Sequence, residues 1–220
     1  MKAVISADII GYTKLEAQRA EDVLRGLREF IDDIEGPQIR TNVDVDFKIK
    51  RGDAIQGVVF NVSEALRLAI MLKAAVTQIS LDKNSKKRHP DIDIRLAIGL
   101  GEAENIRTSI DQSSGEAFTN SGRTLDSMKK EKRTFAIKTP IEEWNHELDT
   151  AFKLLEVILS SWNITSAELM YWLLKGFNES EIAEKLNISQ SAVNQRKKRA
   201  GWSGIEALLK RYEQITSKAN

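Results

Sequence analysis

The chain has 220 residues, 41% hydrophobic and 30% charged, a composition typical of a globular protein with one or two domains. Its 33 lysines and arginines nearly balance 32 acidic residues, which excludes a global polycation, so any nucleic-acid surface must be local. The absence of cysteine and the presence of only two histidines exclude disulfides, thiolate catalysis and multi-histidine metal sites. With no apolar run of membrane length, we expect a soluble, cytoplasmic protein without membrane contact.

The first part of the chain alternates strand and helix patterns. The periodicity predicts strands at about 3–7, 43–49, 54–60, 92–100 and 135–137, with helices at about 13–34, 63–76 and 116–130. Gly52 and Asp53 supply turn chemistry between two strands, which predicts a hairpin. The order βαββαβαβ favours an α+β fold of the ferredoxin-like type, an antiparallel sheet with helices on one face.

The remainder of the chain shows only helical patterns. Thr139 and Pro140 stop the last strand. Helices are expected at about 141–159, 166–175, 179–186, 189–199 and 203–216. We therefore predict an α+β domain at 1–139, a helical connector at 140–162 and an all-α domain at 163–220.

Two carboxylates stand where a predicted strand gives way to a turn. These are Asp8 and Asp53, and side by side they could hold Mg²⁺ or Mn²⁺ bridging a triphosphate. Gly11 and Thr13, at the start of the next helix, would add backbone N–H donors for phosphate. The alternative is that Asp8 caps a helix and Asp53 makes a turn.

Four segments of the first part resemble class III nucleotidyl cyclases. They are ADIIGYTKL, KRGDAIQGVV, IRLAIGLGEA and GEAFTNSGR, and the resemblance covers about residues 1–138. The whole layout, with a helical tail behind, looks most like the SatD family of poorly characterised bacterial proteins. The resemblance implies the cyclase-like form of the ferredoxin-like fold.

The resemblance also implies roles for individual residues. Asp8 and Asp53 match the two metal ligands, Arg123 matches the transition-state arginine, and Thr119 stands where the family has a catalytic asparagine. The nucleotide-binding positions would be Ile9, Gly11, Tyr12, Thr13 and Arg51. Cyclase sites combine the aspartates of one subunit with the asparagine and arginine of another, so a homodimer is implied.

The base-reading half of the site departs from the family pattern. The base-selecting lysine has no clear counterpart, and Gln112 or Asp111 falls near the second base-reading position. This half does not resemble an adenylyl cyclase. For Arg123 a further alternative is a solvated helix arginine paired with Asp126 or Glu116.

The tail contains the spacing of a helix-turn-helix. Asn178 is a good helix cap, and Ala183, Asn187 and Val193 supply the small, turn-forming and apolar residues that such a helix pair needs. This segment resembles the helix-turn-helix of LuxR-type regulators and of sigma-factor region four. The implied partner is double-stranded DNA.

The second helix of this pair carries side chains that can read base edges or hold phosphates. These are Ser189, Gln190, Ser191, Asn194, Gln195, Arg196, Lys197, Lys198 and Arg199. The alternative is a helical bundle for protein contact with an incidental charged face. The absence of acidic residues from 188 to 200 weighs against that alternative.

The sequence thus favours a DNA-binding transcriptional regulator whose degenerate cyclase-like domain senses a nucleotide or dimerises. One alternative is an active nucleotidyl cyclase, a phosphorus–oxygen lyase that makes a 3′,5′-cyclic nucleotide from a nucleoside triphosphate and carries a regulatory tail. A third hypothesis is a dimeric adaptor without a ligand.

Overall fold

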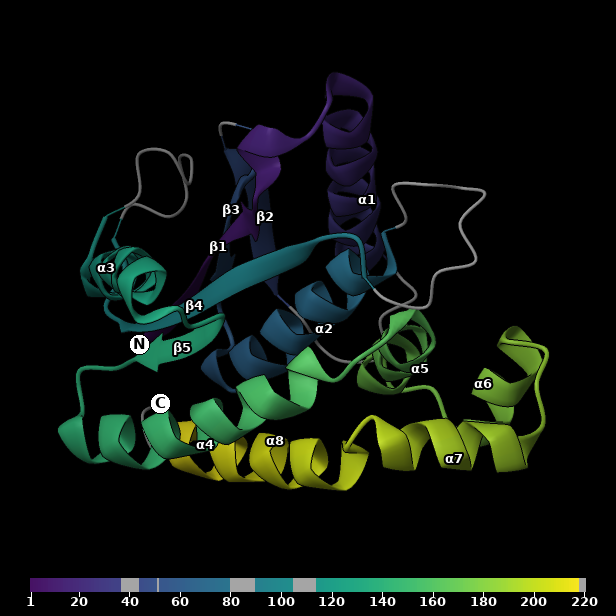
Figure 1. The fold of residues 1–220 in the computed structure, drawn as a ribbon. Helices are drawn as coiled ribbons and strands as arrows, with labels where there is room; N and C mark the ends of the chain where they lie inside the picture. Colours follow the sequence, from purple (N-terminus) through teal and green to yellow (C-terminus); the bar gives the residue numbers. More distant parts are fainter. Residues whose placement is uncertain (37–43, 51, 80–89, 105–113, 218–220) are drawn as a thin grey trace.

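The computed structural model describes residues 1–36, 44–50, 52–79, 90–104 and 114–217 (Figure 1). The strands are β1 (Lys2–Ile10), β2 (Val45–Lys50), β3 (Ala54–Val59), β4 (Asp93–Gly101) and β5 (Phe135–Lys138). The helices are α1 (Ala17–Glu35), α2 (Ala65–Gln78), α3 (Glu116–Glu131), α4 (Glu142–Ser160), α5 (Ile164–Leu174), α6 (Glu179–Lys185), α7 (Gln190–Arg199) and α8 (Trp202–Thr216). Short 3₁₀ helices lie at Tyr12–Lys14 and Val62–Glu64.

The five strands form one sheet in the order β2-β3-β1-β4-β5. All neighbours are antiparallel except β4 and β5, which run parallel. In the middle of the sheet, Val4 of β1 lies opposite Val58 of β3 and Gly99 of β4. The predicted mixed fold with a mainly antiparallel sheet is confirmed.

Helices cover both faces of the sheet, so the prediction of helices on one face is wrong for α3 (Figure 1). Ile5 belongs to the large core that includes the buried sides of α1 and α2. Its neighbour Val4 faces the other way and packs with Val58 and with Ala117 of α3. Glycine at position 99 lets α3 approach closely, since a Cβ there would lie 2.3 Å from the Ala117 carbonyl oxygen. The physical reason is that β1 is apolar at successive positions and must be covered twice.

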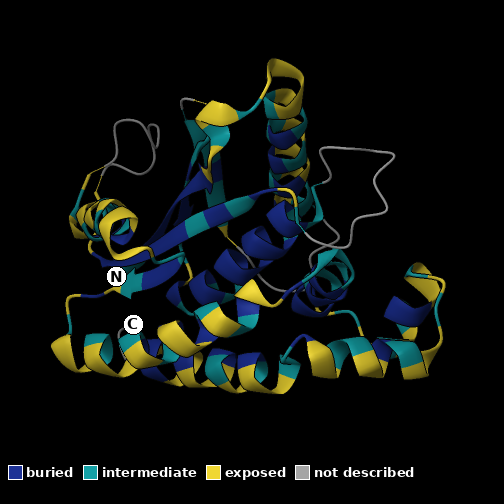
Figure 2. Ribbon diagram, in the orientation of Figure 1, coloured by how far each residue is buried: buried dark blue, intermediate teal, exposed yellow. Residues whose placement is uncertain are grey.

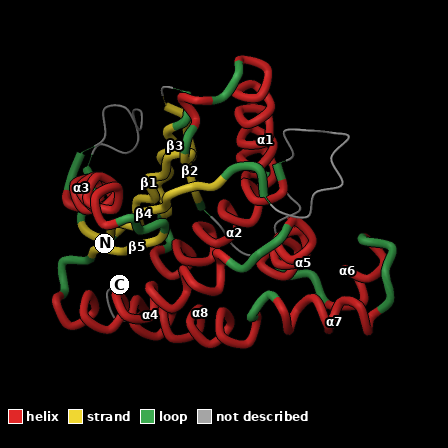
Figure 3. Tube along the Cα trace, viewed as in Figure 1, coloured by secondary structure: helices red, strands yellow, loops and turns green. Residues whose placement is uncertain are grey.

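The chain after β5 is helical and packs against α2 (Figure 3). Figure 2 shows that α2 is buried along most of its length, because it lies between the sheet and the C-terminal helices. Two hydrogen bonds tie the parts together: Tyr212 Oη donates to the Val62 carbonyl oxygen at 3.1 Å, and Arg67 Nη1 donates to that of Leu174 at 3.4 Å. One hydrophobic core therefore runs through both parts, while the domain boundaries at 139 and 162 stay predictions.

Helix α4 packs against β5, the edge strand of the sheet. The Phe152 ring packs 5.4 Å from the Phe135 ring, measured between centroids. Glu156 accepts hydrogen bonds from the Phe135 amide at 2.9 Å and from Arg133 Nε at 3.2 Å. No helix in the described ranges is both long and apolar enough to cross a bilayer.

Candidate functional site

The segments that carry the two aspartates adjoin at one end of the sheet. Asp8 lies opposite Ala54 in the β1–β3 register, and the Ile9 amide donates to the Asp53 carbonyl oxygen at 3.3 Å. The hairpin tip also approaches the turn after β1, because a Cβ on Gly52 would lie 3.3 Å from Tyr12 Cε1. The fold therefore brings together two segments that are more than forty positions apart in the sequence.

The carboxylate of Asp8 is paired with two cations. Its side chain is 12% exposed, and its Oδ1 accepts from Arg95 Nε at 2.7 Å. Its Oδ2 accepts from Arg95 Nη2 and lies near Lys129 Nζ, both at 3.2 Å. Arg95 stands directly opposite Asp8 on β4, and Lys129 comes from α3 above this face. The negative charge of Asp8 is therefore compensated from two elements.

This arrangement does not fit a divalent cation. A metal at Asp8 would have to displace both Arg95 and Lys129 from its oxygens. Hard cations also need several oxygen donors, and no group of three or more potential metal-ligating side chains occurs in the described part of the chain. The metal-ligand role of Asp8 and Asp53 stays a prediction.

The other residues expected to bind a nucleotide differ in how exposed they are. The Ile9 side chain is buried in the core, so Ile9 could offer a ligand only its backbone. Gly11 is exposed and has a left-handed φ of 78°, which starts the 3₁₀ turn Tyr12–Lys14. Thr13 is exposed within that turn, and α1 begins only at Ala17. Arg51, Asp111 and Gln112 lie outside the described residues.

Thr119 and Arg123 lie one turn apart on α3, and both are exposed. Thr119 Oγ1 donates to the Gly115 carbonyl oxygen at 3.2 Å. In the described part of the chain, the α3 residue that pairs with Asp8 is Lys129, not Arg123. A catalytic role for Thr119 and Arg123 would depend on a second copy and stays a prediction.

In the tail, α6 and α7 form a compact helix pair. Asn178 and Glu181 form a capping box that starts α6. Asn187 takes a left-handed φ of 49° in the turn, as asparagine tolerates. Ser189 accepts a hydrogen bond from the Ala192 amide and starts α7, while Val193 is buried. The helices and the turn lie where the sequence placed them; their use in DNA binding stays a prediction.

The proposed DNA-binding residues divide into two groups. Arg196 Nη1 lies 3.9 Å from a carboxylate oxygen of Glu168 on α5, and Lys197 Nζ lies 2.6 Å from Glu179 on α6. These two cations therefore hold α7 against its neighbours. Gln190 donates to Ser180 Oγ at 2.7 Å. The remaining side chains are exposed, namely those of Ser189, which caps α7, and of Ser191, Asn194, Gln195, Lys198 and Arg199.

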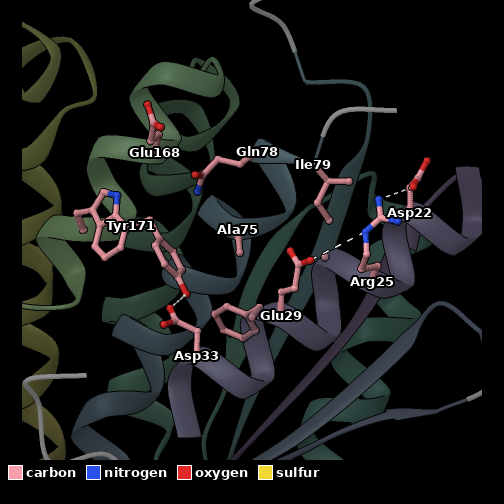
Figure 4. Close-up of a pocket in the computed structure, with 12 residues that line it drawn as sticks. Asp22, Arg25, Glu29, Asp33, Ala75, Gln78, Ile79, Glu168 and Tyr171 are labelled. Atoms are coloured by element: carbon pink, nitrogen blue, oxygen red, sulfur yellow. Dashed lines mark hydrogen bonds and ion pairs between the residues drawn. The ribbon is translucent and has the colours of Figure 1, made fainter. Parts of the chain in front are cut away.

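Sequence reasoning missed a buried charge cluster between α1 and α5. Lys175 is 0% exposed, and its Nζ donates to both Asp33 oxygens at 2.6 and 2.7 Å. Tyr171 also donates a hydrogen bond to Asp33 (Figure 4). Burial raises the pKa of the Tyr171 hydroxyl, and this hydrogen bond raises it further. A signal was present, because Lys175 interrupts the apolar run from Leu169 to Phe177 and must find a partner.

No model of a known protein family matches the chain, and no curated protein matches it. Among solved structures, it is similar to the active GGEEF domain of a diguanylate cyclase from Vibrio cholerae. The two are 17% identical with a TM-score of 0.42, over 62% of this chain and 81% of that one. A likeness this distant carries no argument about function.

Proposed function

We propose that the protein is a DNA-binding transcriptional regulator that reads duplex DNA with α7. The supporting observation is the exposed face of that helix. Asn194 and Gln195 lie three and four residues after Ser191, and four and three residues before Lys198, so the four side chains share one side of the helix, and Arg199 adjoins them. Asparagine and glutamine match base edges in the major groove, and the cations suit phosphates.

The way α7 is held supports this proposal. Val193 anchors the helix in the core, while Arg196 and Lys197 pair with Glu168 and Glu179 on the two neighbouring helices. These contacts fix the opposite side of α7 and leave the polar face free to approach a groove. A rigid recognition surface loses less entropy on binding than a mobile one.

In this proposal, the α+β part is a degenerate cyclase-like domain that binds a nucleotide or forms the dimer. The pairing of Asp8 with Arg95 and Lys129 supports a degenerate cyclase-like domain, because these side chains supply the positive charge that a catalytic metal would otherwise provide. A homodimer would place two copies of α7 on one duplex, as paired half-sites require.

One observation favours the second candidate, an active nucleotidyl cyclase. The Ile9–Asp53 backbone hydrogen bond brings the two aspartate segments together, as a shared metal site would need. The test incubates the protein with each nucleoside triphosphate and Mn²⁺ and analyses the products by chromatography. A cyclic nucleotide that disappears in Asp53→Ala would support catalysis; no cyclic product from any triphosphate would reject it.

The test of the DNA proposal is sequence selection. Duplexes selected from a random pool are compared with an unrelated duplex by fluorescence anisotropy at a fixed salt concentration. The pair Asn194→Ala and Gln195→Ala should reduce the preference for the selected duplex by roughly tenfold or more, since each good base contact contributes about 1–3 kcal/mol. Gln214→Ala, which removes an exposed amide on α8, is the matched control. Failure to bind any duplex, or an unchanged preference in the double variant, would contradict the proposal.

A further inference from the structure

Strand β2 is an edge of the sheet, and its outer side has room for another strand. It is the last strand on the side of α1 (Figure 1), and in the described part of the chain it pairs only with β3. A groove of about 880 Å³ runs beside it and is lined on the other side by Arg28 and Ile31 of α1. The lining includes successive residues of β2, from Phe47 to Lys50, so the groove follows the edge of the strand rather than one of its faces.

The backbone of β2 directs hydrogen-bonding groups toward this edge. The Phe60 amide donates to the Asp44 carbonyl oxygen at 3.0 Å. Residues along an antiparallel strand alternate between bonding their neighbour and facing away from it. By this alternation, the N–H and C=O groups of Val45, Phe47 and Ile49 point away from β3, toward the open edge. Such an edge is a template for pairing with another chain.

The charges along this edge are arranged in two halves. Asp44 and Asp46 stand on one side of Phe47 in the sequence, and Lys48 and Lys50 stand on the other. All four charged residues have the same parity, so their side chains share one face of the sheet. Within the described residues, neither Asp46 nor Lys48 has an ion-pair partner. The groove lies along the basic half.

One antiparallel register pairs all of these charges between two copies of the chain. When a two-fold axis passes through Phe47, Asp46 of each copy lies opposite Lys48 of the other. In the same register, Asp44 lies opposite Lys50. Opposite charges directly across two strands stabilise the pairing. The strand is therefore complementary to itself, as an interface between identical chains must be.

The same register satisfies the backbone. The outward groups of Phe47 bond their symmetry mates, and those of Val45 bond those of Ile49 in the second copy. The charged residues then fall at the non-hydrogen-bonded pairs, where opposed side chains lie closest. An axis at Lys48 would oppose two lysines, and an axis at Asp46 would oppose two aspartates, so charge repulsion disfavours both of these registers.

We propose that a second copy of this chain pairs with β2 in this register, so that two sheets join into one across a two-fold axis. The acidic half of each strand enters the groove beside the basic half of the other, near the partly buried Ile31 and Ile49. The interface contains neither α7 nor the segments of Asp8 and Asp53. It supplies the dimer that the proposed function invokes, but its test needs no DNA or nucleotide, so either proposal can fail without the other.

The test exchanges charges and measures association of the full-length chain by sedimentation equilibrium over roughly 1–100 µM protein. Wild type should dimerise. Asp46→Lys opposes lysines across the axis and Lys48→Asp opposes aspartates, so each variant alone should dimerise at least about tenfold more weakly. An equimolar mixture of the two variants has opposite charges at every pair and should associate as wild type does. Lys210→Asp, which changes an exposed lysine of α8, is the matched control and should dimerise normally.

Three results would overturn the proposal: a monomeric wild type, single variants that dimerise normally, or a mixture that stays monomeric. Amide exchange measured by NMR locates the contact. The Phe47 and Ile49 amides should exchange at least about tenfold more slowly in the wild-type dimer than in Asp46→Lys. The Lys48 amide, which bonds β3 in both, is the internal reference. Equal exchange of the Phe47 amide in the two proteins would place the dimer contact elsewhere and refute the pairing of β2.

Discussion

Asp33→Asn should destabilise the protein more than Lys175→Met, although both variants break the same ion pair. Asp33→Asn leaves the ammonium of Lys175, which is 0% exposed, without a carboxylate. An uncompensated buried charge costs about 3–5 kcal/mol, and we expect about 3 kcal/mol because the Tyr171 and Trp172 rings remain. Lys175→Met removes the charge itself. It leaves Asp33, which is 28% exposed and still accepts from Tyr171, so about 1–2 kcal/mol is expected.

The assay is urea unfolding of the full-length chain, followed by both tryptophan fluorescence and circular dichroism to establish that one transition is measured. Asp33→Asn combined with Lys175→Met should be more stable than Asp33→Asn alone, because the unpaired charge is gone. Asp32→Asn, an exposed neighbour on the same helix, should change the free energy of unfolding by less than about 0.5 kcal/mol. The reasoning is refuted if Lys175→Met costs as much as Asp33→Asn.

Three further predictions follow from single contacts. Burial raises the pKa of the Tyr212 hydroxyl, so the unfolded state loses this proton first and the free energy of unfolding falls above about pH 10. Measured at several alkaline pH values, the free energy of unfolding of Tyr212→Phe should fall less steeply than that of wild type, by up to about 1.4 kcal/mol per pH unit. Gly99→Ala should cost about 3 kcal/mol in urea unfolding because its Cβ would meet the α3 backbone at 2.3 Å, and a loss below about 1 kcal/mol would contradict this packing. About 10 mM MgCl₂ should not change the Tm of wild type, because Arg95 and Lys129 occupy both carboxylate oxygens of Asp8; a rise in Tm would show that Asp8 or Asp53 already binds the metal.

Much of the fold could be predicted because its signals are local. Alternating and helical patterns located the strands and helices, and Asn187 marked the turn with its left-handed backbone. The position of α3 was harder to predict, since it depends on which face of the sheet the connection between β4 and β5 crosses. The sequence predicted a short buried strand at Ala3–Ala7 with helices on one face, whereas Val4 and Ile5 pack on opposite sides of β1.

The partners of the charged residues could not be predicted from sequence. Asp8 meets Arg95 only through the register of β1 on β4, and meets Lys129 only because α3 crosses that face. Within the basic run of α7, nothing local distinguishes Lys197, which pairs with Glu179 eighteen positions earlier, from the exposed Lys198. Tertiary packing decides which cations remain free for a partner.

The salt dependence of DNA binding tests the central claim most directly. Anisotropy titrations of one duplex across a salt series give the slope of log K against log salt, which reports about 0.9 for each phosphate contact. We predict that Lys198→Gln with Arg199→Gln makes the slope shallower by about 2 and weakens binding to every sequence. Lys153→Gln with Lys210→Gln removes the same charge from exposed positions elsewhere and should match wild type. Coincident slopes for the two double variants would contradict the assignment of DNA binding to α7.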